Sequence, residues 1–222
     1  MTARSPELPA NHPLRRLDGR PLAGGRLRLF PGPTSRFGAQ YFSLHLERDG
    51  SLSPEPVLVA LYHSGPYPSY NWIEIAQLND NPVFGGADGT SSAGLGAAGL
   101  RRLMALLGRL IPPGGHLMIE YESPRWKSTA RALNVGAPPA ATELGDLLKA
   151  AGCAASIRNW HIAEGGREGP RKLQGFKPLD EARAQQAQQA RDQELREFLA
   201  VSSTQPKSLA DARRRARRLL RA

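Results

Sequence analysis

Several features of the chain are scarce or missing, and each absence excludes a class of protein. Cys153 is the one cysteine in 222 residues, so no internal disulfide can form and no cysteine-based metal site is available. No run approaches the roughly 18 consecutive apolar residues of a membrane helix, and the first residues lack the apolar core of a secretory signal. We therefore expect a cytoplasmic protein that does not enter a membrane.

Familiar catalytic motifs are also missing. The sequence has no Gly-x-Ser-x-Gly, no phosphate-binding Walker loop and no kinase motifs. Its histidines do not follow a metal-ligand spacing, so we expect no metal site. Aromatic residues make up 6% of the chain, which argues against a dedicated surface for stacking single-stranded nucleic acid.

The chain carries a high positive charge, and its apolar and basic residues are distributed unevenly along its length. Its net charge is +10, and six arginines lie between residues 213 and 221. Such a cluster attracts nucleic acid or an acidic protein surface, so we expect a weak contact of this kind through residues 207–222. Apolar residues concentrate in residues 26–177, which predicts one α+β domain there. Residues 1–25 are expected to form a flexible arm, and residues 178–222 a basic helical extension.

The first half of the domain reads as strands. Residues 40–48 and 72–78 alternate apolar and polar side chains, as half-buried strands do, and residues 57–63 form a continuous apolar run. A shorter strand is expected at residues 26–30. Their short connections predict an antiparallel meander.

Helices and strands alternate in the second half. A glycine-rich turn leads into a helix ending near Ile111, which is stopped by Pro112-Pro113-Gly114-Gly115. A strand is expected over residues 116–122 and an irregular segment after it. Thr142 can cap a helix reaching Ala151. Strands are then expected over residues 156–162 and, in short form, 173–176.

This order resembles the GNAT superfamily of N-acyltransferases, and the chain would be an outlying bacterial or archaeal branch of it. The family's glycine-containing turn, Arg/Gln-x-x-Gly-x-Gly/Ala, corresponds here to Ser91-Ser92-Ala93-Gly94-Leu95-Gly96, with Ser91 in place of the usual Arg or Gln. The resemblance implies a mostly antiparallel sheet flanked by helices. It also implies acetyl-CoA or another acyl-CoA as cofactor, with its phosphates held at the start of the 97–111 helix. The residues implied for this contact are Ser92, Gly94, Leu95, Gly96, Ala97 and Ala98.

Two carboxylates are candidates for catalysis. Glu74 lies between Ile73 and Ile75 on a predicted strand, so its side chain faces away from the core. The resemblance implies that a glutamate on this strand acts as general base toward an amine. Glu120 shares a strand face with Glu122 and could hold the amine-bearing substrate. Family members often use a tyrosine on the next helix as general acid, but residues 123–151 contain none.

A third candidate site is basic. Residues 164–172 combine three glycines with Arg167, Arg171 and Lys172. Basic side chains on a glycine-rich loop suit an anionic ligand or substrate. The segment could also be a long hairpin whose charges only keep it soluble.

Two other functions stay open. The half of the chain from Leu100 onward also resembles the C-terminal half of a class I methyltransferase dependent on S-adenosylmethionine, although no strand followed by Gly-x-Gly-x-Gly precedes it. The chain could also be a non-catalytic GNAT-like binding module, with its basic tail contacting nucleic acid or a protein partner.

Overall fold

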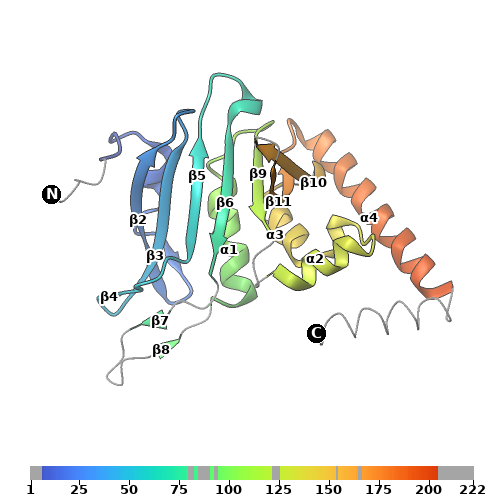
Figure 1. The fold of residues 1–222 in the computed structure, drawn as a ribbon, viewed down its shortest axis with the longest axis horizontal. Helices are drawn as coiled ribbons and strands as arrows, with labels where there is room; N and C mark the ends of the chain where they lie inside the picture. Colours follow the sequence, from blue (N-terminus) through green and yellow to red (C-terminus); the bar gives the residue numbers. More distant parts are fainter. Residues whose placement is uncertain are drawn as a thin grey trace.

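The computed structural model of the chain is an α+β structure built on one large mixed sheet (Figure 1). The strand order is β1-β2-β3-β5-β6-β9-β11-β10, with β4 paired to β3, while β7 and β8 form a separate ladder. The structure describes residues 7–79, 83–84, 91–92, 95–121, 126–153, 155–164 and 167–204. The strands are β1 (Pro21–Leu22), β2 (Gly25–Thr34), β3 (Gln40–Arg48), β4 (Ser51–Leu52), β5 (Leu58–His63), β6 (Trp72–Leu78), β7 (Val83–Phe84), β8 (Ser91–Ser92), β9 (His116–Glu120), β10 (Ala155–Glu164) and β11 (Arg167–Phe176).

The predicted meander is confirmed. Strands β2, β3, β5 and β6 are antiparallel neighbours, and β3 and β6 have the predicted bounds. In β3 the alternate residues Phe42, Leu44 and Leu46 are at most 2% exposed. Alternation of apolar residues therefore sets which face of the sheet meets the core.

A crossover follows the meander and creates the parallel part of the sheet. The chain leaves β6, passes through helix α1 (Gly96–Gly108) and returns in β9, which pairs with β6 in parallel from Trp72–His116 to Ile75–Ile119. The register of β6 against β5 shifts just beyond Ile75, which indicates a bulge. The pairing of β6 with β9 ends at that same point, near the carboxyl ends of both strands.

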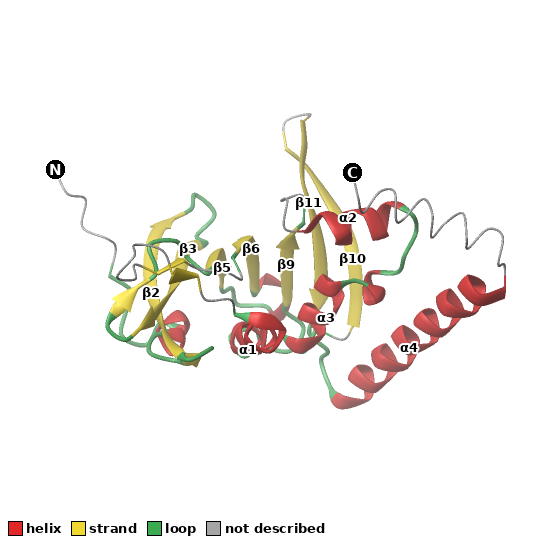
Figure 2. Ribbon diagram, turned by 90° about the horizontal axis from the view of Figure 1, so that it is seen from below, coloured by secondary structure: helices red, strands yellow, loops and turns green. Residues whose placement is uncertain are grey.

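Helices cover one face of this sheet. Helix α1 and helix α3 (Glu143–Ala150) lie on the same side, whereas helix α2 (Lys127–Asn134) lies on the other side, toward which the β10–β11 hairpin rises (Figure 2). Thr142 caps α3 as predicted, its Oγ1 accepting a hydrogen bond from the Gly145 amide at 3.1 Å. The face of the sheet opposite α1 and α3 is therefore where side chains excluded from the core gather.

The expectation of a flexible arm over residues 1–25 is wrong for residues 8–25. A 3-10 helix η1 (Pro13–Leu17) and strand β1 occupy this stretch. His12 caps η1 by accepting a hydrogen bond from the Leu14 amide at 3.3 Å. Leucines in this stretch have no helical or strand period, but tight turns bring each of them to the core; those at most 6% exposed are Leu8, Leu14, Leu17 and Leu22.

Two helices complete the described chain. Helix α2 (Lys127–Asn134) lies in a segment that was expected to be irregular, because its apolar pattern is short and weak. The helix is held in place by Trp126 and Thr129, which are each 2% exposed. Helix α4 (Glu181–Thr204) occupies the described part of the expected helical extension, and it contacts β10 and the 3-10 helix η4 (Pro139–Ala141). The second, arginine-rich helix expected at residues 207–222 falls outside the described residues. No helix in the described chain is long and apolar enough to span a bilayer.

Candidate active site

Three charged residues predicted as site residues meet on the open face of the sheet. Glu74 lies on β6, Glu120 on β9 and Lys172 on β11. Lys172 is opposite Glu120 in the β11–β9 register, and Glu74 is opposite Met118, two residues from Glu120. Because Ile73, Ile75 and Ile119 are at most 1% exposed, the period-two alternation turns these charged residues to the other face.

The three side chains form an ion cluster, which we call the charged triad (Glu74, Glu120 and Lys172). The Lys172 Nζ lies 2.6 Å from Glu74 Oε1, to which it donates a hydrogen bond, and 3.8 Å from Glu120 Oε1. The Lys172 side chain is 5% exposed, whereas those of Glu74 and Glu120 are 16% and 24% exposed. Two carboxylates and one ammonium leave a formal charge of −1, which suits a cationic group of a ligand.

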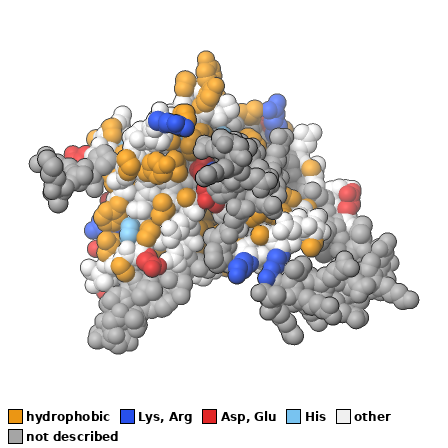
Figure 3. Space-filling model, viewed as in Figure 1, with side chains coloured by type: hydrophobic (Ala, Val, Ile, Leu, Met, Phe, Trp, Pro, Cys, Tyr) orange, Lys and Arg blue, Asp and Glu red, His pale blue; other side chains and the backbone are white. Residues whose placement is uncertain are grey.

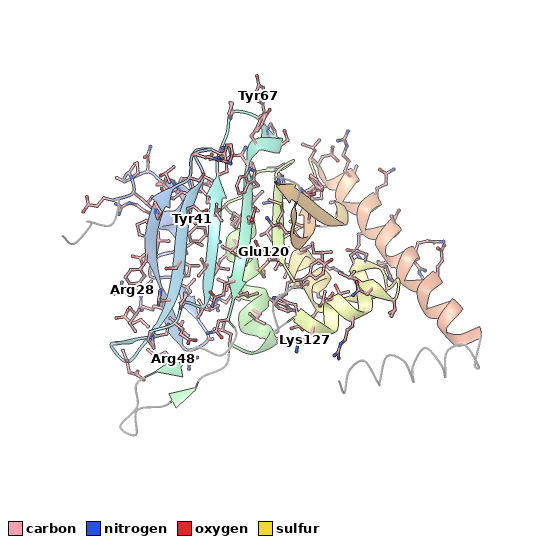
Figure 4. The ribbon with its side chains drawn as sticks, in the orientation of Figure 1. Arg28, Tyr41, Arg48, Tyr67, Glu120 and Lys127 are labelled. Carbon is pink, nitrogen blue, oxygen red and sulfur yellow. The ribbon has the colours of Figure 1, made fainter. Side chains whose placement is uncertain are left out.

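Glu120 is the more accessible carboxylate of the triad. Its Oε1 is farther from the ammonium than that of Glu74, and more of its side chain meets solvent. Glu120 lies near the middle of the sheet face that Figure 4 presents to the viewer. Figure 3 shows the same face, with acidic atoms visible where β6 and β9 lie and apolar side chains gathered over β2, β3 and β5.

A row of rings crosses the same face beside the triad. His63 stacks on Trp72, with centroids 5.3 Å apart and planes 11° apart, and His116 contacts Phe176 at 5.4 Å. Trp72 is opposite both His63 and His116 in the sheet register, and His116 is opposite Phe176. Alternation places Trp72 on the same face as Glu74, so the row borders the charged triad.

His116 is a neutral side chain in this row at neutral pH. Burial lowers the pKa of its imidazole below the usual 6.5, because the charged form loses hydration. Its Nδ1 is buried and has no hydrogen-bond partner in the described structure. If the His116 ring were protonated, its Nδ1–H would therefore be a buried donor without an acceptor in the described structure.

This environment predicts a pH dependence of stability. Unfolded His116 takes up a proton as the pH falls through 6.5, while the folded side chain resists until a lower pH, so its contribution is present above 6.5 and is lost on acidification. Urea unfolding from about pH 7.5 to about pH 5 should show a falling free energy of unfolding, and His116→Phe should reduce that fall. His12, whose pKa burial also lowers, accounts for part of the remaining slope. An unchanged slope in His116→Phe would remove this explanation.

The start of α1 is open and lacks a side-chain cap. Leu95 occupies the N-cap position in helical conformation without a capping hydrogen bond, and the first turn contains no acidic residue. Gly96 has φ of +62°, and Gly96, Ala97 and Ala98 are exposed. The first amides of a helix have no partner within it, so this end can accept an anion.

The remaining residues of the expected turn are described less fully. Ser92 belongs to β8, and Gly94 lies outside the described residues. Leu95 is 5% exposed and belongs to the core, so its contribution to a ligand would come from its backbone. The structure thus places Ser92 in β8 and Leu95–Ala98 at the start of α1.

The expectation of a basic loop over residues 164–172 is wrong in its main feature. Residues 167–172 belong to β11, and Arg167 and Arg171 are opposite Glu164 and His161 of β10. Lys172 is neutralised inside the charged triad and so is not displayed to a free anion. The strand was not predicted here because glycines and charged residues interrupt the alternation of apolar and polar side chains, and such residues are typical of loops.

Other candidate groups are placed in structural roles. Cys153 is fully buried, and burial raises the pKa of its thiol to about 12, so it is not a nucleophile at neutral pH. No group of three or more metal-binding side chains is found among the described residues. Tyr121, the residue after β9, is 1% exposed and belongs to the core.

Comparisons with known proteins place the chain in a family without assigning a function. The chain is similar to a protein of unknown function, AQ1966, from Aquifex aeolicus VF5, whose crystal structure matches with 26% sequence identity and a TM-score of 0.59. The match covers 89% of this chain and 95% of that one. A comparison with curated proteins found no match. Residues 31–202 match a family described as "Protein of unknown function (DUF1122)", so the chain belongs to the DUF1122 family.

Proposed function

We propose that the protein is an acyl-CoA-dependent N-acyltransferase. The observation that carries this proposal is the open, uncapped start of α1, which follows β6 across β7 and β8, at the end of the sheet where the pairing of β6 with β9 stops. Ligands of sheets with parallel strands bind outside the carboxyl ends of those strands, and a helix N-terminus there favours a phosphate. The order of elements in the described chain also follows the order that the GNAT resemblance implies, which supports the proposal.

The exposed first turn would hold the diphosphate of the acyl-CoA. The amides of Gly96, Ala97 and Ala98 come before the first i→i−4 hydrogen bond of the helix and can donate to phosphate oxygens. Small side chains at these positions leave the backbone accessible. A thioester supplies an activated acyl group, whose carbonyl carbon an amine can attack with loss of the thiolate.

The charged triad would serve the amine acceptor. Its formal charge of −1 attracts an ammonium group, and Glu120 is the carboxylate with more accessible surface. We assign to Glu120 the acceptance of the proton that the ammonium must lose before its nitrogen can attack. Glu74 is held by Lys172 at 2.6 Å and positions the cluster, so the role of general base expected for Glu74 is reassigned to Glu120.

A charge placed in the first turn of α1 tests the cofactor site. Ala97→Asp should weaken binding of CoA tenfold or more, about 1.4 kcal/mol, because the added carboxylate repels the phosphates. The same carboxylate interacts favourably with the helix dipole, so the fold is retained. Isothermal titration calorimetry with CoA measures the effect, and Ala97→Asn is the control of equal size without the charge. Equal affinities of the two variants would place the phosphates elsewhere.

Binding measurements also distinguish the two alternative functions, a methyltransferase and a non-catalytic binding module. Binding of S-adenosylmethionine without binding of CoA would favour a methyltransferase, although the antiparallel meander β2-β3-β5-β6 is unlike the parallel sheet of that class. Binding of neither ligand, together with salt-sensitive nucleic-acid binding lost on removal of residues 207–222, would favour a binding module.

A further inference from the structure

A group of apolar and aromatic side chains borders the charged triad on the side of β5. Leu61 of β5 is opposite Glu74 in the sheet register, and Tyr41 of β3 is opposite Leu61. His63 follows Leu61 by two positions on the same strand face, and Trp72 is opposite His63. Leu61 therefore lies among three rings and the Glu74 carboxylate. We call this group the aromatic patch (Tyr41, Leu61, His63 and Trp72).

The aromatic patch is not part of the core. Three of its side chains are half-buried, and the fourth, that of Tyr41, is 40% exposed. The alternate residues of β5, on the other face, are at most 4% exposed. Figure 3 shows apolar side chains gathered over β3 and β5 on the open face, and Figure 4 shows Tyr41 across β5 and β6 from Glu120. The sheet thus presents an apolar surface directly beside the carboxylates.

Two rings of the patch are held in fixed orientations. The imidazole of His63 stacks on the indole of Trp72, with centroids 5.3 Å apart. His63 Nδ1 donates a hydrogen bond to the Tyr70 carbonyl oxygen at 2.6 Å. Because these rings are already ordered, a flat apolar group can bind against them at a small cost in conformational entropy.

The spacing between the patch and the carboxylates determines the shape of the ligand. Directly opposite side chains on neighbouring strands start about 5 Å apart, and side chains two positions apart on one strand about 7 Å. Leu61 and Glu74 are such an opposite pair, and Trp72 and Glu74 are two positions apart. A group on the patch is therefore about 5–7 Å from a nitrogen held by the carboxylates. An aromatic ring joined to an amine through two or three carbons has this separation.

The order of the sites along the sheet suits a reaction between two substrates. The pairing of β6 with β9 stops after Ile75 and Ile119, at the end proposed for the acyl-CoA. The charged triad comes next, and His63 and Trp72 lie farther from that end. An amine bound with its ring on the patch would therefore direct its nitrogen toward the acyl group.

We propose that the acyl acceptor is a primary amine joined through two or three carbons to an aromatic ring, and that this ring lies on the aromatic patch. The proposal rests on the function proposed above, because it takes the charged triad as the site of the amine. Small-molecule sites combine apolar and aromatic side chains with a few polar groups that fix the orientation of the ligand. Trp72 and Tyr41 select the ring, through offset or edge-to-face contacts.

The transfer step is balanced with the groups already named. The ammonium loses one proton to Glu120, and the nitrogen attacks the thioester carbonyl carbon. The carbon–nitrogen bond forms, the carbon–sulfur bond breaks, and a second proton of the nitrogen ends on the sulfur of the departing CoA. The products are an amide and CoA.

Phenethylamine and butylamine test the proposal, because both are primary amines and only the first carries a ring. Calorimetric titration measures binding of each amine, and release of the CoA thiol from acetyl-CoA measures turnover. The wild-type protein should bind phenethylamine about tenfold more tightly or better, because the ring buries more apolar surface. Its kcat/KM should be higher by a similar factor.

Three variants identify the residues that cause this preference. Trp72→Leu should lose most of it, because leucine keeps an apolar side chain on β6 but removes the indole. Tyr41→Ala should reduce it as well, and this variant should fold because Tyr41 is outside the core. Phe37→Ala is the matched control, because it removes a ring that is 68% exposed in the β2–β3 turn, outside the patch.

The outcomes separate this proposal from the function on which it rests. Equal binding and turnover of the two amines by the wild-type protein would overturn the proposal and leave the acyl-CoA function standing. A preference for phenethylamine that Trp72→Leu and Tyr41→Ala both keep would also overturn it. If neither amine binds, the proposal fails, whereas the proposed function fails only if acetyl-CoA does not bind either.

Discussion

Replacing Lys172 with methionine is expected to lower the free energy of unfolding by about 3 kcal/mol, the lower end of the effect of breaking a buried ion pair. Methionine fills much of the space of the lysine stem but removes the ammonium that lies 2.6 Å from Glu74 and 3.8 Å from Glu120. The Lys172 side chain is 5% exposed, so water can replace its ammonium only in part. The partial exposure of the two carboxylates keeps the loss from being larger. Urea unfolding at neutral pH measures the change.

Two further variants identify the cause. Lys127→Met removes an exposed lysine at the start of α2 and should change stability by less than about 0.5 kcal/mol. The double variant Lys172→Met with Glu74→Gln removes one charge of each sign and should recover part of the lost stability. A Lys172→Met protein as stable as the wild type would show that the charged triad does not hold β6, β9 and β11 together.

Replacing Gly108 with alanine is expected to destabilise the protein by at least about 2 kcal/mol, as overpacking of a rigid contact does. An ideal Cβ at Gly108 would lie 2.0 Å from the Ala151 carbonyl oxygen. Because that neighbour is backbone at the end of α3, the clash can be relieved only by moving one helix away from the other. In an unconstrained helix the same substitution stabilises by roughly 1 kcal/mol, so the sign of the effect identifies the packing of α1 on α3.

Gly99 in the same helix supplies the matched comparison. A Cβ at Gly99 would meet the side-chain carbons of Leu95 and Ala23 at 3.2 and 3.4 Å, which can shift slightly. Gly99→Ala should therefore change the melting temperature much less than Gly108→Ala. If thermal unfolding shows Gly108→Ala to be as stable as wild type, α1 and α3 are not packed as closely as described.

The parts of the fold that could be predicted are those with local patterns. Alternation in QYFSLHLER and WIEIAQL defined β3 and β6 to the residue, and Thr142 defined the start of α3. The packed N-terminal stretch could not be predicted in this way. Leu14, Leu17 and Leu22 are separated by turns, so their common destination in the core depends on tertiary contacts rather than on a periodic pattern.

In the candidate site, too, only the features with a local sequence pattern could be predicted. Period-two reasoning placed Glu74 and Glu120 on strand faces, and the structure brings them together. It could not find Lys172 as their partner, because that residue is 98 positions from Glu74 and its strand register depends on the β10–β11 hairpin. The ring pair of His63 and Trp72 was missed for the same reason, since cross-strand neighbours follow from register.

Titration of isotope-labelled protein with acetyl-CoA tests the central claim most directly, through the backbone amide resonances of the first turn of α1. The account predicts that the amides of Gly96, Ala97 and Ala98 shift strongly and saturably, because their N–H groups donate to the phosphates. Amides of α4, which is far from this end of the sheet (Figure 1), should stay unchanged. Saturable shifts confined to other elements, or none at all, would contradict the claim that the start of α1 holds an acyl-CoA.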